Sequence, residues 1–91
     1  MSHLNAATDD LVKRLHRILG QVRAIERALA SGADCAKTLH LVAAARGAMR
    51  GLMDQILAAH LHEHVARPGL SDAERSKGVA DLLTVLRRHA R

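Results

Sequence analysis

The first third of the chain carries apolar residues at helical spacing. Between residues 8 and 31 they alternate steps of four and three, which draws one continuous stripe along an α-helix. The stripe consists of Leu11, Leu15, Ile18, Val22, Ile25 and Leu29. Thr8 before two aspartates is typical of a helix start, and the pair Ser31-Gly32 is typical of a helix end. The pattern predicts a helix over about 8–31 that packs against another helix.

Two further helices follow. After Asp34 no proline occurs before Pro68, and the spacing stays helical, which predicts a long central helix over about 33–66. The sequence Ser-Asp-Ala-Glu at residues 71–74 fits a capping box, and apolar residues at helical spacing follow it. This predicts a third helix over about 72–90.

The expected fold is therefore all-α, with a three-helix protomer built around a long central helix. We find no repeat and no linker long enough to separate two domains, so residues 1–91 are predicted to form a single domain. Residues 1–7 are expected to form a mobile N-terminal arm.

The composition favours oligomerisation. The 91 residues include no Phe, Tyr or Trp, so the core consists of smaller aliphatic side chains, and a monomer of this size is marginally stable. Gly47 and Gly51 lie among alanines in the middle of the central helix, where two copies of that helix could cross closely. The alternative, with equal weight, is that both glycines let the first helix pack tightly against the central one.

The charge points to a polyanionic partner. Fourteen Lys and Arg against nine Asp and Glu give a net charge of +5. Arg14, Arg17 and Gln21 follow at i, i+3 and i+7, which predicts a polar stripe distinct from the apolar one. With Arg46 on the central helix, they are candidate contacts to double-stranded DNA. No run of apolar residues is long enough for a signal peptide or membrane span, so we expect a cytoplasmic protein without a membrane partner.

Three residues of the central helix could carry metal chemistry. His60 and His64 are four residues apart, so their imidazoles project from one helix face and can chelate one ion. Cys35 lies 25 positions before His60, about 37 Å along a continuous helix, so one chain cannot bring the two together. An antiparallel dimer with a two-fold axis near residue 48 would place Cys35 of one copy close to His60 of the other. His3 on the N-terminal arm could add a nitrogen ligand.

Each of these features also has an ordinary interpretation. With seven histidines in the chain, one pair at i and i+4 is more often two solvated side chains, and a lone cysteine is more often a small buried hydrophobe. The arm that carries His3 could simply be a disordered tail. Their combination is what favours a metal site.

Three segments together resemble the CsoR/RcnR family of metal-responsive repressors over nearly the whole chain. Residues 14–21 (RLHRILGQ) are similar to the family pattern Arg-x-x-[Arg/Lys]-Ile-x-Gly-Gln. The second segment is residues 45–53 (ARGAMRGLM), and the third is Asp34-Cys35 with residues 60–64 (HLHEH). The resemblance implies an antiparallel helical dimer that assembles to a homotetramer, a dimer of dimers, with a metal site shared across the dimer interface.

The resemblance also implies an effector. Copper(I) sensors of the family resemble one another in having Cys, His and Cys at the positions of Cys35, His60 and His64, whereas this chain has His64 in place of the second thiolate. Persulfide sensors of the family need a second cysteine, which this chain lacks. The set His3, Cys35, His60 and His64 is similar to that of the nickel- and cobalt-responsive RcnR subgroup. The implied effector is Ni(II) or Co(II), with Zn(II) as a further candidate.

The sequence thus predicts a repressor, not an enzyme, that leaves its operator when Ni(II) or Co(II) binds and so derepresses a metal-efflux gene. One alternative is a formaldehyde-responsive repressor of the same family that uses Cys35. Formaldehyde sensors of the family typically have Pro at position 2 and an acidic residue at position 64, where this chain has Ser2 and His64. Another is a cytosolic histidine-rich metal buffer or chaperone. A metalloenzyme is disfavoured, since the chain offers no carboxylate-rich bundle interior and no obvious general base beside the ligands except Glu63.

Overall fold

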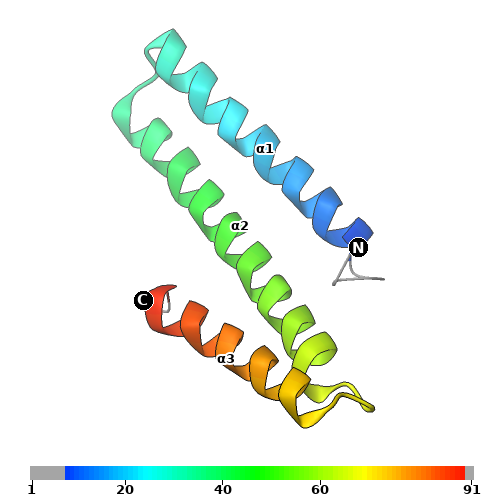
Figure 1. Ribbon diagram of the computed structural model, residues 1–91. Coiled ribbons are helices and arrows are strands. Elements are labelled where there is room, and N and C mark those ends of the chain that lie inside the picture. Colours follow the sequence, from blue (N-terminus) through cyan, green and yellow to red (C-terminus); the bar gives the residue numbers. More distant parts are fainter. Residues whose placement is uncertain (1–7, 90–91) are drawn as a thin grey trace. The chain divides into compact units, whose positions relative to one another are not determined.

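The structure is a computed structural model that describes residues 8–89, and this part of the chain is helical without strands. It consists of α1 (Thr8–Ser31), α2 (Cys35–Leu61), the π-helical turn η2 (His62–Ala66) and α3 (Asp72–His89) (Figure 1). The all-α, three-helix prediction is confirmed. Contacts within the chain divide it into two units, residues 9–54 and the segment from Gln55 to the end of α3.

In the first unit, α1 ends at a glycine in the left-handed conformation. Gly32 has φ of 69°, its N–H bonds to the carbonyl of Leu29, and the N–H of Ala33 bonds to the carbonyl of Ala28 at 3.0 Å. This 6→1 and 5→2 pair is a Schellman motif, which satisfies the last carbonyls of a helix. The predicted break at Ser31-Gly32 is confirmed.

A second cap starts α2 immediately afterwards. The Asp34 carboxylate accepts a hydrogen bond of 2.8 Å from the N–H of Lys37, as an N-cap residue does for the third residue of a helix. The chain therefore reverses within residues 32–34, and α1 and the first part of α2 form an antiparallel hairpin (Figure 1).

The core of this hairpin is small and aliphatic. On α1 the buried residues are Leu11, Ile18 and Ala28, and on α2 they are Ala45 and Leu52. Ile18 is the most enclosed, with 2% of its surface exposed. Burying a side chain of this size contributes about 1.5–3 kcal/mol, so a few such residues hold the two helices together.

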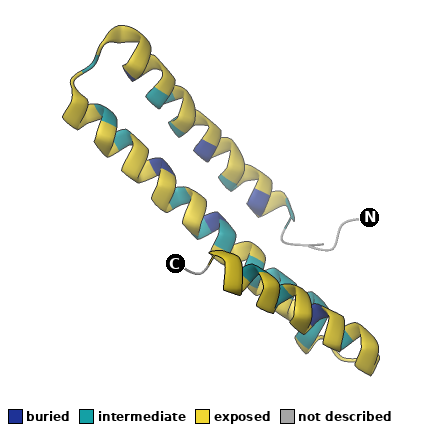
Figure 2. Ribbon diagram, turned by 60° about the vertical axis from the view of Figure 1, so that its left-hand side comes forward, coloured by how far each residue is buried: buried dark blue, intermediate teal, exposed yellow. Residues whose placement is uncertain are grey.

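The predicted apolar stripe of α1 is buried only in part. Leu15, Val22 and Leu29 belong to it but are exposed, Leu29 to 68%, whereas Leu11 and Ile18 are buried (Figure 2). The reason is geometric, since one partner helix covers a narrower strip than the apolar residues of α1 occupy. The hairpin covers one edge of the stripe and leaves the other edge open.

The end of the central helix also differs from the prediction. Residues 33–66 were expected to be one α-helix, but the α-helix ends at Leu61 and the last turn, His62–Ala66, is π-helical. π-helical turns are rare and occur mostly as single turns, frequently at functional sites. This turn carries His64, one of the three histidines predicted to bind metal.

In the second unit, α3 begins with the predicted capping box. The Ser71 hydroxyl accepts from the N–H of Glu74 at 3.1 Å, and the Glu74 carboxylate accepts from the N–H of Ser71 at 2.9 Å. The remainder of α3 is largely open, because Gly78 is the buried residue among those described in this helix. Residues 8–89 contain no helix with the length and apolar content needed to cross a bilayer.

Candidate metal centre and nucleic-acid interface

His60 and His64 lie side by side at the end of α2. Their ring centroids are 4.8 Å apart and the rings are tilted by 41°, although one residue belongs to α2 and the other to η2. Both side chains are half-buried. The predicted proximity of the two imidazoles is therefore confirmed, and two neutral imidazoles at this spacing suit chelation of one transition-metal ion.

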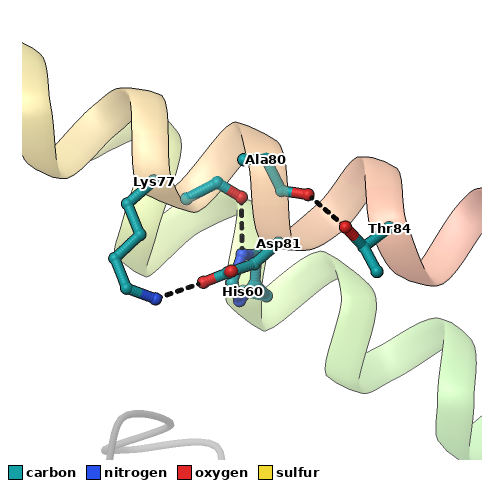
Figure 3. A network of polar contacts seen from close by, with 6 residues as sticks. His60, Lys77, Ala80, Asp81 and Thr84 are labelled. Atoms are coloured by element: carbon teal, nitrogen blue, oxygen red, sulfur yellow. Dashed lines mark hydrogen bonds and ion pairs between the residues drawn. The ribbon is translucent and has the colours of Figure 1, made fainter.

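The backbone of α3 lies directly against these histidines. Nε2 of His60 is 2.9 Å from the carbonyl oxygen of Gly78, across 18 residues of sequence (Figure 3). A Cβ added to Gly78 would overlap the carbonyl of His64, at 2.8 Å from its carbon atom. Glycine at position 78 is what allows the approach.

Arg75 and Asp81 of α3 make further polar contacts close to the two histidines. The Arg75 guanidinium donates to the carbonyls of Val65 and Leu70, which tie the end of η2 and the following turn to α3. Lys77 Nζ donates a hydrogen bond of 2.8 Å to Asp81 (Figure 3). This bond holds the pKa of the Asp81 carboxyl below its ordinary value, and the nearby charges of Lys77, His60 and His64 act in the same direction while burial opposes them.

Cys35 is the first residue of α2 and is exposed. Within residues 8–89, no three side chains of His, Cys, Asp or Glu lie close enough to hold a metal ion together. His3, the fourth predicted ligand, lies outside the described residues. Two imidazoles, with a thiol and further nitrogens supplied from elsewhere, form a donor set that fits borderline ions such as Ni(II) and Co(II). The structure thus brings together two of the four predicted ligands.

The four predicted DNA-binding residues divide into two pairs. Arg17 of α1 and Arg46 of α2 are exposed, and no carboxylate of the described residues forms an ion pair with either. Arg14 and Gln21 are half-buried. Two cations without counter-ions on one hairpin can meet the phosphates of a nucleic acid.

The prediction that Arg14, Arg17 and Gln21 form a polar stripe distinct from the apolar one is wrong for Arg14 and Gln21. Arg14 and Gln21 share the helix face of Leu11 and Ile18, because steps of three and seven residues keep them close to that face. The Arg14 guanidinium is the nearest group to a Cβ built on Gly51, with Nη1 at 3.2 Å. Oε1 of Gln21 is buried and has no hydrogen-bond partner in the described chain.

The two glycines of the central helix have different surroundings. Gly51 lies against Arg14, which supports tight packing of α1 on α2 at that position. At Gly47 an added Cβ would meet nothing within 4 Å in the described chain. Packing of α1 therefore accounts for Gly51 and leaves Gly47 open to a crossing with a second copy.

The sequence interpretation missed Gly78 and Arg75. A glycine inside the otherwise helical pattern of residues 72–90 usually marks a packing or functional reason, and this signal could have identified Gly78. Contacts of Arg75 with backbone carbonyls leave no trace in the sequence.

Comparisons with known proteins agree with the geometry. The family model described as "Metal-sensitive transcriptional repressor" matches residues 7–88. An uncharacterized protein in the bioA 5' region of Serratia marcescens is 44% identical over 96% of both chains. The transcriptional repressor RcnR of Salmonella arizonae is 37% identical over 94% of both chains.

A solved structure has the same fold. It is a glutamate-to-histidine variant of the formaldehyde-responsive regulator FrmR from Salmonella enterica serovar Typhimurium, with a TM-score of 0.87 and 35% identity. The similarity covers 93% of this chain and 96% of that one. The chain therefore belongs to the CsoR/RcnR family of metal-sensitive transcriptional repressors.

Proposed function

We propose that this protein represses transcription in the metal-free state and leaves its operator when Ni(II) or Co(II) binds, which derepresses a metal-efflux gene. The observation that carries the proposal is the pair of imidazoles of His60 and His64, 4.8 Å apart at the end of α2. Zn(II) is a further candidate effector, since it also binds imidazole and thiolate.

The proposed metal site needs two copies of the chain. His60 and His64 come from one protomer, and Cys35, at the opposite end of α2, comes from its partner in an antiparallel dimer. His3 completes the ligand set. The exposed position of Cys35 supports this arrangement, because its thiol is accessible to a second chain. Each chain forms a single metal-sensing, DNA-binding domain. Two dimers assemble to a homotetramer, which acts in the cytoplasm.

The proposed DNA interface uses Arg17 and Arg46 as direct phosphate contacts, because both are exposed cations on one hairpin. Arg14 and Gln21, which are half-buried, belong to the same interface and become available through the rearrangement that accompanies assembly or DNA binding. Phosphate contacts position the protein, and duplex shape supplies specificity. Metal binding favours a tetramer shape that binds DNA poorly, with a coupling of about 1–3 kcal/mol.

The similarity to RcnR supports a metal effector, and the family is one of transcriptional regulators rather than enzymes. A second candidate is a formaldehyde-responsive repressor that uses Cys35. It is favoured by the structural similarity to FrmR and by the exposure of the thiol. A histidine-rich metal buffer or chaperone is the candidate from another class.

The test is operator binding measured by fluorescence anisotropy. A fluorescent duplex from the region upstream of the gene is titrated with the metal-free protein, and Ni(II), Co(II), Zn(II), Cu(I) or formaldehyde is then added. The measurement is repeated with Cys35→Ala and with His40→Ala, an exposed histidine of α2 outside the proposed ligand set, as the matched control.

We expect Ni(II) or Co(II) to release the wild type and His40→Ala, and Cys35→Ala to stay bound. Release by formaldehyde without any metal response would replace the metal effector with the aldehyde. Absence of specific operator binding would favour the buffer and contradict the proposed function.

A further inference from the structure

The contact between α3 and the two histidines has a chemical consequence for His60. A carbonyl oxygen can only accept a hydrogen bond, so the ring nitrogen 2.9 Å from the Gly78 oxygen must donate it. The His60 ring therefore carries its proton on Nε2. In the neutral imidazole, the lone pair that can bind a metal then belongs to Nδ1.

The same residue of α3 controls the approach to His64. Gly78 lies so close to the carbonyl of His64 that a Cβ would stand 2.8 Å from the carbonyl carbon and 3.0 Å from the His64 Cβ. The neighbour is backbone, which cannot move aside as a flexible side chain can. Any larger residue at position 78 would push α3 away from η2 and lengthen the hydrogen bond to His60.

We propose that Gly78 is a positioning residue for the metal-ligating histidines. Its carbonyl fixes His60 in the Nε2–H form with Nδ1 free for metal, and its missing side chain allows α3 to hold the turn that presents His64. The proposal rests on the proposed function for the identity of the ligand, but its first two tests need neither metal nor DNA.

Arg75 and Gly78 together bind the turn from one side of α3. They are three residues apart on one helix face, where Arg75 donates to the carbonyl of Val65 in η2 and the carbonyl of Gly78 accepts from His60 in the last turn of α2. The α3 backbone thus holds the end of α2 at His60, and the Arg75 guanidinium holds η2 at Val65, next to His64. A substitution in α3 that touches no metal ligand should therefore alter the metal site.

The first test is the tautomer of His60 in the metal-free wild type. Long-range ¹H–¹⁵N NMR spectra at about pH 8, where imidazoles are neutral, distinguish protonated from unprotonated ring nitrogens. We expect a protonated Nε2 and an unprotonated Nδ1 for His60. A protonated Nδ1 would overturn the proposal, and this outcome does not depend on any variant folding.

The second test is amide hydrogen exchange in the metal-free protein. In His60→Ala and Gly78→Ala, the amides of α3 should exchange at least tenfold faster than in the wild type, while those of α1 are unchanged. The matched controls are His62→Ala, which changes an exposed histidine of η2, and Ser76→Ala, which changes an exposed residue of α3. Equal exchange of α3 in His60→Ala and His62→Ala would contradict the role of the hydrogen bond.

The third test uses Co(II) alone as the probe. Gly78→Ala keeps every proposed ligand, yet we expect its Co(II) absorption spectrum to differ from that of the wild type and its Co(II) affinity to fall at least fivefold. Ser76→Ala should match the wild type. A normal spectrum and affinity in a folded Gly78→Ala would refute the positioning role. Failure of Ni(II) or Co(II) to release DNA would contradict the proposed function instead and leave the tautomer result unchanged.

Discussion

The imidazole rings of His60 and His64 are neighbours, with centroids 4.8 Å apart, although a change from α-helix to π-helix falls between the two residues. Because both rings would serve one ion, their contributions to metal binding should be coupled. His60→Ala and His64→Ala should each lower Ni(II) affinity by at least tenfold, and the double variant should lose less than the sum of the two free-energy changes. Competition with a chromophoric chelator measures this, with His62→Ala as the control. Additive losses would indicate two independent sites.

The N-terminal arm provides a separate prediction. If His3 completes the metal site, His3→Ala should weaken the release of operator DNA by Ni(II) more than it weakens DNA binding by the metal-free protein. Anisotropy titrations with and without Ni(II) separate the two effects. Normal release in this variant would exclude His3 from the response.

The exposed arginines of the hairpin should determine the salt dependence of DNA binding. Arg17→Ala should reduce the slope of log K against log salt concentration by about one unit for each phosphate that the arginine neutralises. Arg67→Ala is the matched control, since its guanidinium is already paired with Glu63 at 3.2 Å. An unchanged slope in Arg17→Ala would remove this residue from the DNA interface.

Capping residues explain how much of the fold the sequence could predict. Gly32, Asp34 and the Ser71–Glu74 box act on their own neighbours along the chain, and for such local interactions the sequence contains the whole signal. The helix ends were therefore predicted to within a residue or two, apart from the π-helical turn, and the mutual approach of His60 and His64 followed from their spacing.

The remaining features depend on contacts between distant residues. A spacing pattern does not say which edge of a wide apolar stripe a partner helix will cover, so Leu15 and Arg14 were each assigned to the wrong surroundings. The approach of Gly78 in α3 to His64 and its hydrogen bond with His60 join residues 14 and 18 positions apart, which no local pattern records.

The open space at Gly47 distinguishes the two interpretations of the central glycines. If two copies of α2 cross there, Gly47→Ala should weaken self-association, because an added Cβ would meet the second helix. Sedimentation velocity over a range of protein concentrations measures this. In an uncrossed helix the same change would leave association intact and raise stability by about 1 kcal/mol through helix propensity.

The capping box of α3 predicts a pH dependence. The backbone hydrogen bond from Ser71 lowers the pKa of Glu74 below its ordinary value of 4.5. A lowered pKa means that the charged form stabilises the folded state, so this contribution is complete above 4.5 and is lost as the pH falls through the lowered pKa. The loss of helicity of the wild type in this acidic range should be larger than that of Glu74→Gln. Circular dichroism measures it, and identical acid profiles would contradict the prediction.

The open edge of the α1 stripe, where Leu15, Val22 and Leu29 are exposed, affects how the protein should respond to heating. Exposed apolar side chains that line up along one helix are often covered by another protein surface. If copies of the chain cover it for one another, folding and association bury the same side chains and become one equilibrium. The thermal midpoint then rises with protein concentration, and a single free energy of unfolding has meaning only when that concentration is stated.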